Sequence, residues 1–139
     1  MAKKKSWKDK LNDEKREQLK PLEKDFWGYH IGDIMLIATP KIIENYVQQI
    51  PSGKITTPEV MRKDLAIEFN ATFTCPMTSG IFLRIVAEAA YEEFLQNGDA
   101  TKITPFWRII EPESKLASKL TFGENFIKEM RSKEREILD

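Results

Sequence analysis

The sequence contains very few residues of the kind that form metal sites and disulfides. It has one cysteine, Cys75, and one histidine, His30, among 139 residues. A lone cysteine cannot form an internal disulfide, which is typical of a reducing compartment and predicts a cytoplasmic location. Two isolated ligand-type residues also fall short of the set that a zinc ion needs, and no glycine-rich phosphate loop is present. We therefore expect neither a metal nor a cofactor.

Long apolar runs and an excess of charge of one sign are also missing. No stretch approaches 18 uncharged apolar residues, so we expect no membrane span. The basic start is not followed by an apolar run, which argues against a secretory signal. Lys plus Arg and Asp plus Glu number 22 each, and this balance argues against a globally basic nucleic-acid binder. The length is sufficient for one domain with one core.

The beginning of the chain differs in composition from the rest. Residues 1–24 contain nine Lys or Arg and five Asp or Glu, which leaves 13 basic and 17 acidic residues for 25–139. Ser6 is a candidate cap for a short helix with Trp7 and Leu11 on one face. So little apolar surface favours a basic, mobile arm or a loosely docked helix over residues 1–27, with the domain at 28–139. The alternative is an arm that contacts phosphates.

Local start and stop signals predict the elements of that domain. Thr39-Pro40 and Thr57-Pro58 each place a capping threonine before a proline at the first helical position. Apolar spacing, turn residues and alternation then predict an extended segment over 28–39, helices over 40–50, 58–69, 78–96 and 123–136, and a hairpin with strands at 104–110 and 115–120. Three helices followed by a hairpin and a helix indicate an α+β winged helix-turn-helix.

Three motifs resemble the C-terminal domain of the O6-alkylguanine-DNA alkyltransferases. Residues 50–57, Ile-Pro-Ser-Gly-Lys-Ile-Thr-Thr, are similar to its I-P-x-G-K-x-T-x opening. Residues 105–116 resemble its active-site stretch P-C-H-R-V-I-x-x-x-G-K-L, without a gap. Residues 84–89 resemble the R-A-V-G-x-A of its recognition helix. The resemblance covers about residues 40–130.

A closer likeness, over nearly the whole chain, is to a poorly characterised branch of that superfamily. The matching segments are Ser6-Trp7, residues 35–40, residues 74–82 and Pro105-Phe106-Trp107-Arg108. The likeness implies a winged-helix domain that lacks the family's N-terminal ribonuclease-like domain, because only about 40 residues precede the shared region. Its implied partner is duplex DNA. The residues that it assigns to DNA binding are Thr78, Ser79, Gly80, Arg84, Lys54 and Lys115. Those that it assigns to the base pocket are Pro58, Pro105, Phe106, Trp107 and Arg108.

The departures from the family pattern exclude its chemistry. Alkyl transfer needs a thiolate and a base to activate it, but the family's cysteine position is Phe106 and its histidine position is Trp107. Pro58 occupies the position of the family's tyrosine that rotates the base out of the helix. Residues 117–120 occupy the position of the family's glycine-rich pocket loop. We therefore expect a non-catalytic, alkyltransferase-like DNA-binding protein linked to DNA repair, with modified guanine as its ligand. The alternatives are a winged-helix module for protein–protein contact and an enzyme that uses Cys75.

Several single residues keep two interpretations. Arg84 could insert into the base stack, with Gly80 as the alternative position one turn earlier, or pair with Glu88 at i+4. Cys75 could be a displaced nucleophile at a helix start or a small buried side chain. Phe106 and Trp107 could form an aromatic platform for a base, although alternation along a strand would bury one of them. Arg108 is expected to be structural.

Overall fold

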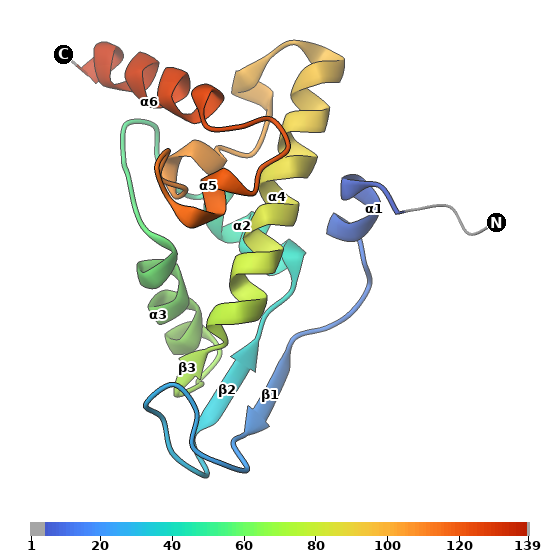
Figure 1. Cartoon of the computed structure of the whole chain (residues 1–139), viewed down its shortest axis with the longest axis vertical. Helices are drawn as coiled ribbons and strands as arrows, with labels where there is room; N and C mark the ends of the chain where they lie inside the picture. Colours follow the sequence, from blue (N-terminus) through green and yellow to red (C-terminus); the bar gives the residue numbers. More distant parts are fainter. Residues whose placement is uncertain (1–4, 139) are drawn as a thin grey trace.

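The computed structural model describes residues 5–138, and Figure 1 shows their arrangement. The architecture is α+β, as predicted. The helices are α1 (Trp7–Leu11), α2 (Pro40–Gln48), α3 (Pro58–Glu68), α4 (Pro76–Asn97), α5 (Lys115–Ser118) and α6 (Asn125–Leu138). The strands are β1 (Gln18–Pro21), β2 (Ile34–Ile37) and β3 (Phe73–Thr74). Two 3-10 helices, η1 (Ala100–Lys102) and η2 (Phe106–Arg108), follow α4.

Helix α4 forms the centre of the molecule. It is the longest helix, and α1, α2, α3 and η2 all pack against it (Figure 1). Six consecutive residues, 85–90, are buried, so this part of the helix is covered on every side. Within residues 5–138, no helix combines the length and apolarity needed to cross a membrane.

The predicted helix boundaries are confirmed where a local signal specified them. The Thr39 hydroxyl accepts a hydrogen bond from the Ile42 amide at 3.2 Å, and the Thr57 hydroxyl accepts one from Val60 at 3.1 Å. Each bond satisfies an amide that has no partner inside the helix. Gly98 ends α4 with φ +69°, a conformation that a residue without a Cβ adopts readily.

The three-stranded sheet has the order β1-β2-β3. Strand β1 pairs antiparallel with β2, where Gln18 lies opposite Ile37. Strand β3 pairs parallel with β2, where Phe73 lies opposite Met35. The predicted extended segment contains β2, whereas β1 and β3 were not predicted. Residues 70–76 resemble a connecting loop in sequence because two residues of strand are too few to show alternation.

The described part of the predicted arm, residues 5–27, lies within the fold. The Ser6 hydroxyl accepts from the Asp9 amide, and the Asp9 carboxylate accepts from the Ser6 amide, so α1 has a reciprocal cap. Leu11 is buried in the core, and the Trp7 ring packs against the same core. Strand β1 is part of the sheet. The low apolar content of this segment is compensated because Leu11 is buried and Trp7 packs against the core, with α1 lying on α4.

The predicted hairpin at 104–120 is wrong. Residues 106–108 form η2, and residues 115–118 form α5, whose first turn is capped by the Ser114 hydroxyl. In a strand, Phe106 and Trp107 would point to opposite faces, and the sequence predicted that one of them would be exposed. In the structure, both side chains are buried. A tight 3-10 turn directs both rings into the core. The two strands expected for a wing are therefore not present between residues 104 and 120.

Candidate functional site

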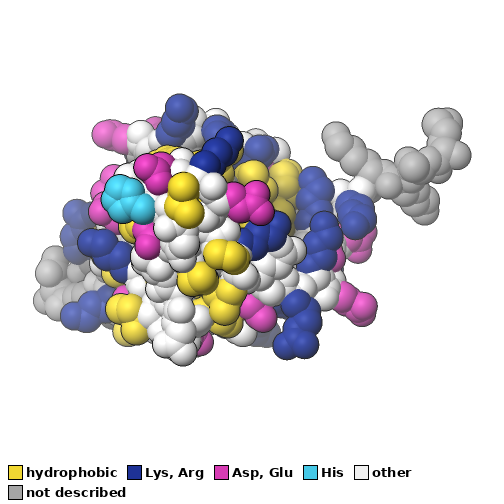
Figure 2. Space-filling model, turned by 90° about the horizontal axis from the view of Figure 1, so that it is seen from below, with side chains coloured by type: hydrophobic (Ala, Val, Ile, Leu, Met, Phe, Trp, Pro, Cys, Tyr) yellow, Lys and Arg dark blue, Asp and Glu magenta, His cyan; other side chains and the backbone are white. Residues whose placement is uncertain are grey.

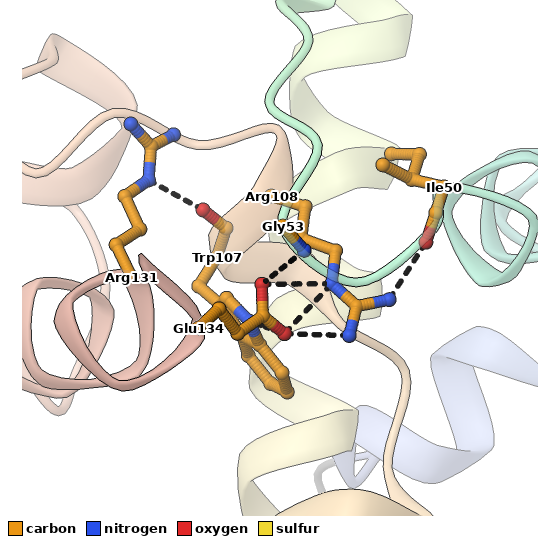
Figure 3. A network of polar contacts seen from close by, with 6 residues as sticks. All are labelled: Ile50, Gly53, Trp107, Arg108, Arg131 and Glu134. Atoms are coloured by element: carbon orange, nitrogen blue, oxygen red, sulfur yellow. Dashed lines mark hydrogen bonds and ion pairs between the residues drawn. The ribbon is translucent and has the colours of Figure 1, made fainter. Parts of the chain in front are cut away.

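The fold brings two of the family-like motifs into direct contact. The Arg108 guanidinium donates from Nη1 to the Ile50 carbonyl at 2.6 Å. The Thr56 amide donates to the Arg108 carbonyl at 2.8 Å. Residues 50–57 and 105–108 lie about fifty positions apart in the sequence and are neighbours in space (Figure 3).

Glu134 on α6 holds this contact together. Its carboxylate accepts from Arg108 Nε at 2.9 Å and Nη2 at 2.5 Å, and from Trp107 Nε1 at 2.9 Å. It also accepts from the Gly53 amide at 3.3 Å (Figure 3). Glu134 was not predicted as a site residue. The available signal was its position seven residues after buried Ile127, on the core-facing side of an amphipathic helix.

The carboxylate of Glu134 remains ionised in this setting. Burial raises its pKa, but hydrogen bonds from Arg108, Trp107 and Gly53, together with the Arg108 charge, outweigh that effect and place the pKa below its usual range. An ionised group with these donors accepts hydrogen bonds and has no proton to give near neutral pH. The network therefore positions the two motifs and offers no general acid.

Phe106 and Trp107 do not form an exposed platform. Their exposed fractions are 0% and 2%. The Phe106 ring lies 5.5 Å from Phe122 and 5.7 Å from Phe126, measured between centroids, within an aromatic cluster that also contains Tyr91. Stacking on a base requires an open ring face, and this conformation provides none. The expectation of an aromatic platform is corrected for this reason.

Three of the five predicted pocket residues line one cavity, and the other two do not. A cavity of about 810 Å³ lies beside η2 and is lined by Pro105, Trp107 and Arg108, together with residues of α2 and α6. Phe106 and Pro58 do not line it. Pro58 is half-buried at the first position of α3. Arg108 has the structural role that the sequence indicated, since its guanidinium is engaged by Glu134 and Ile50.

The predicted residues at the start of α4 differ in accessibility. Ser79 is buried, and its hydroxyl donates to the Pro76 carbonyl at 3.1 Å. Thr78 and Gly80 are half-buried, and a Cβ on Gly80 would meet open space. The exposed side chains of these two turns are those of Met77 and Ile81.

Arg84 forms the i+4 pair with Glu88. Its Nε lies 3.7 Å from the Glu88 carboxylate, and its guanidinium lies 5.2 Å from the centre of the Trp7 ring. The Arg84 side chain keeps 34% of its surface exposed. Glu88 is buried and accepts hydrogen bonds from the Thr121 amide and hydroxyl. Its carboxylate therefore faces the protein interior, away from any ligand at the surface of α4.

The remaining candidates lie apart from this region. Lys54 is exposed in the loop after α2, and Lys115 is exposed at the start of α5. Cys75 is buried before α4, while His30 lies in an exposed loop beside Asp25. Among residues 5–138, no cluster of three or more His, Cys, Asp and Glu side chains is arranged to hold a metal ion.

Comparison of the chain with protein-family models, with curated proteins and with solved structures gave no match. The likeness to the alkyltransferases therefore depends on the sequence motifs alone.

Proposed function

We propose that this protein is a non-catalytic, alkyltransferase-like protein that binds duplex DNA with the α3–α4 helix pair. Its proposed role is in DNA repair, with modified guanine as the recognised base and the cytoplasm as its location. The finer fold assignment, a winged helix-turn-helix similar to the alkyltransferase C-terminal domain, belongs to the same proposal, with η2 and α5 in the place of the two wing strands. The observation that carries it is the partly exposed, acid-free start of α4.

The start of α4 is suited to a polyanion. Residues 76–84 contain no Asp or Glu, and the positive end of the helix dipole lies there. Helix α3 packs against α4, as in a helix-turn-helix, where the second helix reads a groove with its N-terminal residues. Residues 85–90 are buried, and the exposed turns after them carry Glu92 and Glu93, so the first turns of α4 are the part suited to a groove. Arg84 is the cation that directly precedes the buried residues 85–90.

The residue at the alkyl-acceptor position, Phe106, supports a protein that does not catalyse alkyl transfer. Phe106 has no nucleophilic atom and no exposed surface. Cys75 is buried, and the structure shows no hydrogen bond between its thiol and a base among the described residues. Incubation with DNA that carries a labelled methyl group should therefore leave no label on Cys75. Transfer of label to Cys75 would replace the proposal with the enzyme alternative.

The test is a fluorescence anisotropy titration with matched duplexes that contain guanine or O6-methylguanine, at two salt concentrations. We expect binding that weakens as salt rises, because phosphate contacts release counterions. Arg84→Ala should weaken binding by about tenfold, equivalent to roughly 1.4 kcal/mol. Lys128→Ala is the matched control, since Lys128 also pairs with a glutamate four residues away, Glu124 at 2.9 Å, but lies on α6. Absence of binding at low salt would overturn the proposal.

A protein-interaction module is the second candidate. Met77 and Ile81 are exposed on α4, and Ile67 is exposed on the neighbouring α3, which gives this end of the molecule an apolar component. Under this alternative, DNA does not bind at low salt and the Met77→Ser variant loses a protein partner. Salt-dependent binding to DNA would decide against it.

A further inference from the structure

Neither the backbone conformation nor the burial at position 27 explains why the residue there is a tryptophan. Phe26 and Tyr29 exchange backbone hydrogen bonds at 3.0 and 2.8 Å around a two-residue turn. The two central residues, Trp27 and Gly28, have φ +54° and +81°. Turns with two positive φ values favour Asn-Gly, and a bulky residue at the first position is disfavoured. The Trp27 side chain is nevertheless 64% exposed.

A cavity of about 430 Å³, here named the turn pocket, lies between this turn, α3 and β3. Its aromatic wall consists of Trp27, Tyr29 and Phe73, and the last two rings stack with centroids 3.9 Å apart and planes 3° apart. The volume falls in the range of about 300–1,000 Å³ that is typical of small-molecule sites. Phe73 is buried and Tyr29 is half-buried, so the stacked pair forms a rigid back wall and the exposed Trp27 ring is the face available to a planar group.

The opposite wall of the turn pocket carries positive charge. Arg62 and Lys63 of α3 line it, and Glu59 is its one acidic residue. Among residues 5–138, neither Arg62 nor Lys63 has an ion-pair partner within 4 Å, although Arg62 is half-buried. Figure 2 views the molecule from this end and shows exposed hydrophobic side chains with both basic and acidic side chains around them. Two unpaired cations beside an aromatic wall suit a ligand that is planar at one end and anionic at the other.

The turn pocket adjoins the proposed DNA-binding helix. Pro76, the first residue of α4, is among its lining residues. We infer that the pocket receives one unpaired nucleotide of the bound DNA, with the base against Trp27 and the phosphate at Arg62 and Lys63. This inference depends on the proposed function and deepens it. Stacking on an aromatic side chain accepts any base, and the Glu59 carboxylate can accept a hydrogen bond from an exocyclic amino group.

The experiment compares two duplexes of one sequence, of which the second carries a single unpaired cytidine. Wild-type protein should bind the bulged duplex about tenfold more tightly than the fully paired one, a typical effect of one stacked base. Trp27→Asn should remove that preference and leave the affinity for the paired duplex unchanged. Ile31→Ala is the control, because Ile31 is exposed in the same loop and does not line the pocket.

The outcomes separate the two proposals. Equal wild-type affinity for both duplexes would overturn the turn-pocket inference and leave duplex binding intact. Absence of binding to either duplex would overturn the proposed function and the inference with it. A preference that persists in Trp27→Asn would also overturn the inference, because the base would then be bound elsewhere.

A stability measurement distinguishes a binding role of Trp27 from a structural one. Asparagine suits the first position of this turn, so Trp27→Asn should retain or raise the thermal midpoint. Intrinsic fluorescence provides a second readout, since Trp107 is buried and Trp7 is half-buried. The bulged duplex should quench wild-type emission and produce little quenching in Trp27→Asn. A clear fall in the midpoint of this variant would indicate that Trp27 is needed for folding, contrary to the inference.

Discussion

Glu134 shows how one residue can connect three segments of the chain. Its carboxylate receives hydrogen bonds from η2 and from the loop at Gly53, while its backbone belongs to α6. Removing one partner of a buried ion pair is more damaging than replacing both, because the other charge stays buried without compensation. Arg108 would be the uncompensated charge.

Glu134→Gln should lower the free energy of unfolding by about 3 kcal/mol at pH 7, the low end of the range for breaking a buried pair, because the amide oxygen can still accept hydrogen bonds. The folded-state pKa of Glu134 lies below its usual value, so its stabilisation is complete above the usual pKa and is lost as pH falls through the folded-state pKa. The difference between wild type and variant should therefore shrink below about pH 4. Urea denaturation at neutral and acid pH measures it.

Glu129→Gln is the control for that experiment, because Glu129 is an exposed partner of Lys133 on the same helix. Its effect should stay under about 0.5 kcal/mol. A difference for Glu134→Gln that is the same at neutral and acid pH would show that the carboxylate charge does not stabilise the fold.

At the scale of elements, the contact between α2 and α3 contains a tyrosine whose pKa is raised, Tyr46. The Tyr46 hydroxyl donates to the Asp64 carboxylate at 2.5 Å. Burial, followed by the hydrogen bond to Asp64 and its charge, raises the pKa of Tyr46 to about 12. A neutral phenol is thus favoured in the folded state. Its contribution to stability is complete below the usual tyrosine pKa near 10 and is lost as pH rises through about 12.

Asp64→Asn should lower the pKa of Tyr46 toward 10 without reaching it, because burial is the largest cause of the shift. Ultraviolet absorbance of the phenolate across alkaline pH measures this change, and subtraction of a Tyr46→Phe titration assigns it. Glu68→Gln, an exposed acidic position at the end of the same helix, should leave the titration unchanged. An unchanged curve for Asp64→Asn would show that the hydrogen bond does not control Tyr46.

The elements also show where sequence patterns succeed. Thr39, Thr57 and Gly98 act within one helical turn, so their signals were sufficient to predict the ends of α2, α3 and α4. The pattern at 104–110 failed because a segment buried on both sides shows no alternation, and Pro105 starts a 3-10 turn instead of a strand. Strand β1 was missed because all four of its residues are exposed.

At the scale of the whole molecule, the N-terminal segment decides how much of α4 is available. Helix α1 covers α4 near Arg84, so this segment limits the proposed DNA contact to the first turns of α4. Leu11 is the anchor of that segment, with 8% of its surface exposed.

Leu11→Ala should lower the free energy of unfolding by about 2–3 kcal/mol, the low end of the range for a buried leucine. Urea denaturation should show one transition for wild type and variant, because the segment unfolds together with the core. Leu19→Ala on β1, where the side chain is half exposed, should change stability by less than about 0.5 kcal/mol. Equal effects of the two substitutions would place α1 outside the cooperative unit.

The sequence by itself determined the α+β class, the capped helices and the absence of a thiol and an imidazole at positions 106 and 107. These features depend on residue identity and on contacts within about one helical turn. The tertiary structure alone decided that both rings are buried, that Glu134 meets Arg108, and that Trp27, Arg62 and Phe73 surround one pocket. Such contacts join residues far apart in the chain, and they form only when the segments bury their apolar faces against one another.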